Sequence, residues 1–435
     1  MSPSRRIVLM GVGAGGLAAG AAAAAPASRP GSAEDPAEDQ ARLHAMLERY
    51  DGFGSKASGG PGDEACGAWL EETLTGWGYA CRRQPFNVPW FEARQAALTS
   101  GDATAPVIPQ AIVVTTGATG VTAPLRLASG HGDLTGAIAM LVLPYKRWAA
   151  LADPQVAKPL ADAFARGAVA AILVTAGPTG EAVALNVTTH KPGFERPVAI
   201  LAPRDAKAFI AAAELGRPGT LVVDGQGGQR NAFNLIARLD RKAARTLILS
   251  TPRSGWFRCA AERGSGLAVW LSLARWLARG QQGVNIELLA TSGHEYEYLG
   301  GEHYLAQAPA PALTSLWVHV GASAAARDWH ELGPVLRPLP SADSQRVLTA
   351  TADIVASVRT AFQGVSGLEA TYVADRTTAG GELVNVLDAG YTTAIGLYGG
   401  HRYFHTQGDD MRCVSAGLVA PVATAFRVAV ERSLS

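Results

Sequence analysis

Four short apolar runs in the second half of the chain constrain the fold more than any other feature. They lie at residues 246–250, 284–290, 313–320 and 392–398, and each has the composition of a strand buried on both faces. A helical pattern at 265–279 separates the first two. Buried strands that alternate with helices predict an α/β fold with a mixed, mostly parallel sheet sandwiched by helices. Ligand sites in such sheets lie beyond the carboxyl ends of the strands.

The length of the chain limits its number of domains, and its net charge limits the classes of partner that it can attract. Its 435 residues, of which 48% are hydrophobic, are enough for two packed domains. The formal net charge of +1 provides no electrostatic attraction to a nucleic acid or a membrane surface, so we expect neither as a partner.

Residues 1–27 have the pattern of a twin-arginine signal peptide. Arg5 and Arg6 precede a run rich in glycine and alanine, and the Ala25-Pro26-Ala27 stretch offers a cleavage site with small residues. The run is only moderately apolar, which argues against a membrane anchor. We therefore expect a periplasmic or secreted protein that has no membrane span after signal cleavage. Twin-arginine export follows folding, so a cofactor can be loaded beforehand.

The four cysteines are too few for a disulfide framework in a chain of this length. A bridge between Cys66 and Cys81 is one option in an oxidising compartment. Cys259 and Cys413 are interpreted as small, buried apolar residues.

Two stretches carry a resemblance to a known family. Residues 291–304 (TSGHEYEYLGGEHY) resemble the E-E-x-G-x-x-G-S segment of the zinc aminopeptidases, peptidase family twenty-eight. Residues 404–410 (FHTQGDD) resemble the H-T-x-x-D near the C-terminus of that family. The strand at 231–239 and the order of helix, glycine-rich loop, helix and strand at 41–86 are also similar to it. The resemblance implies a zinc-exopeptidase-like fold.

An insert interrupts this core. Residues 102–228 differ in character and contain short apolar strands next to helices, which resembles the protease-associated domain found inside many of these aminopeptidases. The resemblance therefore divides the peptidase-like core into a first part at 28–101 and a second part at 229–435.

Position by position, the resemblance implies that part of a two-zinc site has been lost. The family uses a His-x-Asp after one strand, an Asp that opens the next helix, a Glu, a further Asp and a C-terminal His. Pro252 and Ser254 stand at the first two positions, and neither is a credible zinc ligand. Val318 or His319 stands where the further Asp belongs.

The positions that remain imply one zinc ion. Glu262 replaces the bridging Asp, Glu295 keeps the ligand Glu and His405 matches the C-terminal His. Glutaminyl cyclases, which share the fold, hold a single zinc with these three positions. His294 stands where the family has its general base, so it is the candidate acid/base group. His319 is a candidate fourth ligand or oxyanion partner.

Four further residues are candidates for substrate binding. Arg253 and Trp256 stand near the lost metal position and would form a wall of the cleft. Arg376 would bind a substrate carboxylate, and Glu382 lies in a loop that resembles one near the family's substrate pocket.

The sequence thus predicts hydrolysis of an amide bond in a peptide-like small molecule at one zinc ion. The alternative is a metal-free pseudoenzyme that binds such a molecule in the same cleft. A third hypothesis is metal-independent acid–base catalysis by His294 and Glu295. A geometric test separates them, because a zinc site requires Glu262, Glu295 and His405 to converge on one point at about 2.0–2.2 Å.

Overall fold

The structure, a computed structural model, describes residues 36–130, 132–188, 193–280, 283–332 and 335–434. The predicted signal peptide lies outside the described residues. None of the helices in the described ranges is long and apolar enough to cross a membrane. The four cysteines are free thiols, so the structure does not contain the optional bridge between Cys66 and Cys81.

A mixed sheet forms the centre of the core, as the apolar runs predicted. In spatial order its strands are β1 (Ala80–Ser100), β7 (Pro218–Leu239), β9 (Asn285–Thr291), β8 (Thr246–Pro252), β10 (Thr314–Val320), β15 (Ala394–Gly399), β13 (Arg346–Ala350) and β14 (Thr371–Val373). Strands β9, β8, β10 and β15 are parallel neighbours. Their carboxyl ends therefore meet at one edge of the sheet.

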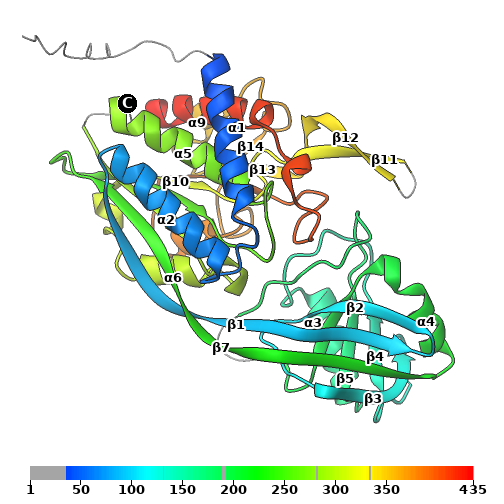
Figure 1. The fold of residues 1–435 in the computed structure, drawn as a ribbon. Coiled ribbons are helices and arrows are strands. Elements are labelled where there is room, and N and C mark those ends of the chain that lie inside the picture. Colours follow the sequence, from blue (N-terminus) through cyan, green and yellow to red (C-terminus); the bar gives the residue numbers. More distant parts are fainter. Residues whose placement is uncertain (1–35, 131, 189–192, 281–282, 333–334, 435) are drawn as a thin grey trace, which may run out of the picture. The chain divides into compact units, whose positions relative to one another are not determined.

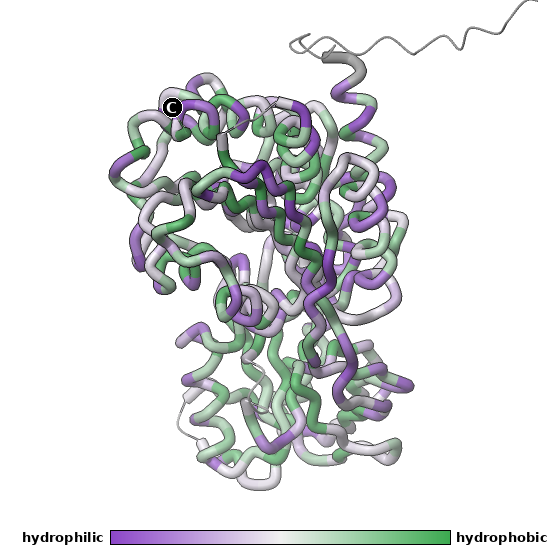
Figure 2. Tube along the Cα trace, turned by 90° about the vertical axis from the view of Figure 1, so that its left-hand side faces the viewer, coloured by the Kyte–Doolittle hydropathy of each residue, from purple (hydrophilic) through white to green (hydrophobic). Residues whose placement is uncertain are grey.

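Helices cover both faces of this sheet (Figure 1). One face packs against α1 (Pro36–Gly52), α2 (Pro61–Gly76), α5 (Gly264–Gly280), α7 (Val355–Ala361) and α9 (Ala416–Leu434). The other packs against α6 (Leu299–Leu305) and α8 (Leu383–Asp388). Side chains alternate along each strand, so Leu316 and Val318 of β10 enter the first core and Trp317 enters the second. Figure 2 shows hydrophobic stretches in both the upper and the lower part of the described chain, with hydrophilic residues interspersed along the tube.

The insert extends the same sheet. It contributes β2 (Ala103–Pro109), β6 (Val198–Leu201), β5 (Ala170–Val174), β4 (Ile138–Val142) and β3 (Gly117–Leu127), together with α3 (Pro154–Ala165), η1 (Pro203–Asp205) and α4 (Lys207–Glu214). The long strands β1 and β7 pair antiparallel and join insert to core (Figure 1). The sequence pattern indicated β1 only as far as Phe86, but the strand continues to Ser100.

Short elements complete the fold at the edge where the parallel strands end. They are η2 (His294–Tyr296), η4 (Met411–Cys413) and the hairpin of β11 (Arg327–Leu332) and β12 (Val335–Ala342). Helix η3 (Pro311–Leu313) precedes β10 at the opposite edge. Gly293 takes a positive φ of 76° between β9 and η2, and this turns the chain so that His294 and Glu295 face the site.

Candidate functional site

The predicted catalytic and metal-binding residues gather beyond the carboxyl ends of the parallel strands. Glu262 precedes α5, His294 and Glu295 follow β9, His319 lies near the end of β10, and His405 follows β15. Each is at most 6% exposed to solvent. The site is therefore a set of buried polar groups, in which every charge needs a partner.

Arg263 supplies a buried cation at the centre of this site. Its Nη2 lies 2.7 Å from Glu262 Oε1, and its Nε donates to the carbonyl oxygen of Ser254 at 2.9 Å. His405 Nε2 lies 3.2 Å from the same Glu262 oxygen. Although burial opposes its charge, Arg263 and His405 hold the pKa of Glu262 well below its usual range. Glu262 is therefore a carboxylate that pairs with Arg263 and faces the His405 ring.

Both carboxylate oxygens of Glu295 accept hydrogen bonds. Its Oε1 accepts from the backbone N–H of Ser58 at 2.7 Å, and its Oε2 accepts from the Ser254 hydroxyl at 2.8 Å. Burial raises the pKa of Glu295, and these hydrogen bonds act against that rise. Ser254, which stands where the family has a zinc-binding Asp, thus donates a hydrogen bond to Glu295, the residue at the retained ligand position.

The three predicted zinc ligands do not fit a zinc ion. Glu262 and His405 meet, but Arg263 already pairs with the Glu262 oxygen that faces His405. Within the described ranges, only one group of three histidine, cysteine or carboxylate side chains has its ligand atoms within 4.8 Å of one another, and it contains none of the three. Ligands of a zinc ion bound at about 2.1 Å would lie closer together than this. The predicted convergence of Glu262, Glu295 and His405 is therefore not observed.

His294 and Glu382 form a second polar pair. His294 Nδ1 lies 3.2 Å from Glu382 Oε1, which also accepts from the Thr291 hydroxyl at 2.7 Å. The His294 ring packs edge-on against Tyr298. Burial lowers the pKa of His294 well below its usual value and raises the pKa of Glu382. The imidazole is thus neutral, with one nitrogen oriented by the Glu382 side chain.

His319 is fully buried with one ring nitrogen bonded. Its Nδ1 lies 3.0 Å from Ser250 Oγ, while its Nε2 makes no hydrogen bond to any described residue. A Cβ atom added at Gly321 would lie 3.1 Å from this Nε2, so glycine is needed there for the ring to fit. Burial lowers the pKa of His319 to about 4, so the ring is neutral at neutral pH.

Two of the predicted substrate-binding residues lie away from the site. Arg253 is buried, where it pairs with Asp63 at 2.9 Å and donates to the carbonyl oxygens of Phe233 and Ala290. Arg376 is exposed and pairs with Asp388 at 2.5 Å. Both predictions are corrected, because Arg253 fastens α2 to the sheet and Arg376 belongs to a surface ion pair. Glu382 and Trp256, by contrast, lie at the site.

The cover segment, residues 181–187 of the insert, closes the site. The Ala184 N–H donates to the carbonyl oxygen of His405, and His405 Nδ1 donates to that of Ala184, both at 2.9 Å. The Val187 N–H donates to the carbonyl oxygen of Glu295 at 3.1 Å. Trp256 Nε1 donates to Asn186 Oδ1 at 2.8 Å. The segment therefore lies directly against His405, Glu295 and Trp256.

Several residues around the site hold strained backbone conformations. His405 has a φ of 57°, and Glu297 and Tyr298 have φ values of 46° and 72°. Non-glycine residues adopt such values only where surrounding contacts impose them. Here the paired hydrogen bonds between His405 and Ala184 supply the constraint.

Sequence reasoning missed the roles of Arg263 and Ser58. The place of Arg263 directly after Glu262 is a signal that a cation could lie beside that carboxylate. Ser58 lies in the glycine-rich loop between α1 and α2, where nothing in the sequence distinguishes its backbone N–H from its neighbours.

Comparison with known proteins supports the fold. No protein-family model matches the chain, and no curated protein matches it in sequence. A zinc aminopeptidase from Bacillus subtilis is similar in structure with a TM-score of 0.70 at 18% identity, over 90% of this chain and 94% of that one. A peptidase M28 precursor from Shewanella amazonensis has a TM-score of 0.68 at 17% identity, over 91% and 93%.

An aminopeptidase from Aneurinibacillus sp. strain AM-1 is also similar, with a TM-score of 0.63 at 16% identity, over 91% of this chain and 93% of that one. These matches span nearly the full length of each protein, insert included. The chain therefore has the fold of the zinc aminopeptidases.

Proposed function

We propose that the chain is a metal-independent relative of the zinc aminopeptidases that binds a peptide-like small molecule at the carboxyl ends of β8, β9 and β10. The observation that carries this proposal is the position of Arg263. Its guanidinium pairs with Glu262 and supplies positive charge where the resemblance implies a zinc ion. A second cation on the same buried oxygen would repel the first.

Arg263 also provides a reason to expect a ligand. Its Nη1 is buried and makes no hydrogen bond to any described residue, and the same holds for His319 Nε2. Unsatisfied buried polar atoms lower stability and are rare in folded proteins. A peptide carbonyl or carboxylate oxygen is an acceptor that suits a guanidinium donor. The peptidase fold of the chain agrees with a ligand of this class.

The test of metal independence compares zinc content and hydrolysis in two proteins. The wild-type protein and a Glu262→Gln variant are stripped with chelator, supplied with zinc and assayed with amino-acid p-nitroanilides. We expect equal zinc content and no zinc-dependent hydrolysis in either. Zinc that is held by the wild type and lost with activity in Glu262→Gln would overturn the proposal.

The test of binding uses di- and tripeptides of mixed composition in titration calorimetry. We expect at least one peptide to bind the wild type and to bind an Arg263→Lys variant about tenfold more weakly, because lysine keeps the charge but loses the planar fork. Arg94→Lys, which changes an exposed arginine of β1, is the matched control. Equal affinity in all three proteins contradicts the role of Arg263.

Amide hydrolysis without a metal is a second candidate function. It is favoured by the pairing of His294 with Glu382, because a carboxylate that orients a neutral imidazole leaves the other ring nitrogen free to take a proton from water. We expect His294→Gln to abolish any hydrolysis of peptide substrates that survives metal removal. His44→Gln, which changes an exposed histidine of α1, should leave it unchanged.

A further inference from the structure

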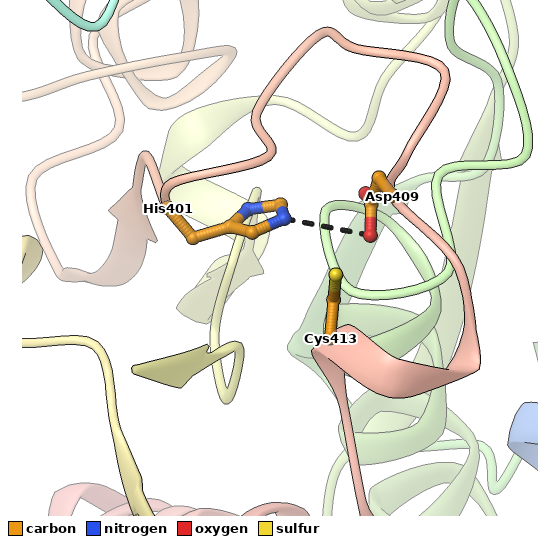
Figure 3. A group of neighbouring side chains, drawn as sticks. All are labelled: His401, Asp409 and Cys413. Carbon is orange, nitrogen blue, oxygen red and sulfur yellow. Dashed lines mark ion pairs between the residues drawn. The ribbon is translucent and has the colours of Figure 1, made fainter. Parts of the chain in front are cut away.

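A second cluster of metal-binding side chains lies next to the site and is separate from the predicted zinc ligands. His401 follows β15, Asp409 precedes the short helix η4, and Cys413 is the last residue of η4. All three are buried, and one ligand atom from each lies within 4.8 Å of the other two. Figure 3 shows the His401 ring facing Asp409, with the Cys413 sulfur directed toward the space between them.

The separation of His401 and Asp409 suits metal ligands. His401 Nε2 lies 3.4 Å from Asp409 Oδ1, and this nitrogen makes no hydrogen bond to any described residue. Two ligands of a tetrahedral zinc ion at about 2.1 Å lie about 3.4 Å apart. A buried imidazole nitrogen aimed at a carboxylate and a thiol, without a hydrogen bond, is an observation that points to an ion.

Neighbouring groups orient the histidine and the carboxylate ligand. His401 Nδ1 lies 3.0 Å from Ser323 Oγ, which fixes the ring. The two oxygens of Asp409 accept from the backbone N–H groups of Ala261 and Glu262, each at 2.9 Å. Such partners of histidine and carboxylate ligands are typical of metal sites, where they hold the ligands in place before the ion binds.

We propose that His401 Nε2, Asp409 Oδ1 and Cys413 Sγ bind one zinc ion as its three protein ligands. Nitrogen, oxygen and sulfur together form a donor set that zinc accepts. The Cys413 thiol loses its proton when its sulfur binds the ion, and the proton leaves to solvent. The site ties the segment from His401 to Cys413 to the turn before α5. It is independent of the proposed function, because it uses none of the residues in the Arg263 site.

Spectroscopy on the intact wild-type protein provides the first test. We expect one zinc ion per chain, with X-ray absorption showing one sulfur at about 2.3 Å and nitrogen or oxygen neighbours at about 2.0–2.2 Å. Cobalt in place of zinc should show thiolate-to-metal absorption in the near ultraviolet. A metal-free protein, or a metal without a sulfur neighbour, overturns the proposal and leaves an ordinary His–Asp pair.

Variants provide the second test. Cys413→Ser should weaken metal binding by about 100-fold and remove the thiolate absorption. Cys66→Ser, which changes a buried cysteine of α2, should retain both. Glu262→Gln should retain the ion, whereas an ion held by Glu262, Glu295 and His405 would be lost from it. This last comparison separates failure of the present inference from failure of the proposed function.

Discussion

At the scale of single residues, the site depends on how buried charges are matched. Glu262 is ionised inside the protein because Arg263 lies 2.7 Å away and His405 faces the same oxygen. Asp63 and Arg253 form an equivalent pair beneath α2. Removing one member of such a pair leaves a charge that neither solvent nor protein compensates.

Arg263→Met should therefore destabilise the protein strongly. We expect the free energy of unfolding at pH 7 to fall by about 3–5 kcal/mol, because Glu262 is left buried without its main partner. The double variant Glu262→Gln/Arg263→Met should recover most of this loss. Urea unfolding followed by circular dichroism measures both. A single variant as stable as the wild type would show that Glu262 has another source of compensation.

Glu262 should also make the free energy of unfolding depend on pH. The pKa of Glu262 is lower in the folded than in the unfolded protein, so its contribution to stability is present above the unfolded value. That contribution is lost progressively as the pH falls below about 4.3 toward the folded pKa.

His319 makes the protein less stable at mildly acidic pH. Its folded pKa of about 4 lies below the usual value of 6.5, so the unfolded chain binds a proton that the folded chain excludes. Between these two pH values, stability should decrease by about 3 kcal/mol as the pH falls. His319→Asn should flatten this part of the profile, measured by urea unfolding, whereas His44→Asn should not. A His319→Asn profile as steep as the wild type contradicts the assignment.

At the scale of elements, the sequence predicted the core well and the site's surroundings poorly. The strands at 246–250 and 284–290 are continuous apolar runs, and β8 and β9 confirm them. The three predicted zinc ligands do not converge on one point, because a motif indicates which positions lie together and says nothing of which partner each side chain takes. In the folded protein Arg263 forms an ion pair with Glu262. The Ser58 N–H donates a hydrogen bond to Glu295.

The cover segment is the element of the insert that forms hydrogen bonds with His405, Glu295 and Trp256. Asn186→Ala removes the hydrogen bond from Trp256 and should weaken closure by about 0.5–1.5 kcal/mol. We expect the backbone amides of Ala184 and Val187 to exchange hydrogen about threefold to tenfold faster, measured by mass spectrometry. Gln155→Ala, a change at an exposed position of α3, is the control. Unchanged exchange at both amides would mean that Asn186 does not secure the segment.

At the scale of the whole molecule, β1 and β7 connect the insert and the core into one sheet. Their antiparallel pairing runs from Ala80 opposite Arg238 to Thr99 opposite Thr220. Pairing over this length explains how a segment of the insert reaches His405 and Glu295. The sequence did not predict the full length of β1, because Pro89 follows soon after the predicted end at Phe86 and proline is uncommon inside strands.

The predicted route of the whole chain is export by the twin-arginine pathway. Replacing Arg5 and Arg6 by lysine should leave the protein in the cytoplasm, measured by fractionating cells that produce it. Arg94→Lys/Arg204→Lys, at exposed positions of the mature chain, should not alter the distribution. Export of the Arg5→Lys/Arg6→Lys variant would exclude this pathway.

Because Arg263 pairs with Glu262, the positive charge beside this carboxylate does not depend on the metal content of the surroundings. A positive charge carried on a side chain is synthesised with the polypeptide and is present in every copy from the moment of folding. It cannot be withdrawn by a competitor's chelators or exchanged for a wrong ion. The occupancy of this position is therefore independent of the zinc supply of the cell and its surroundings.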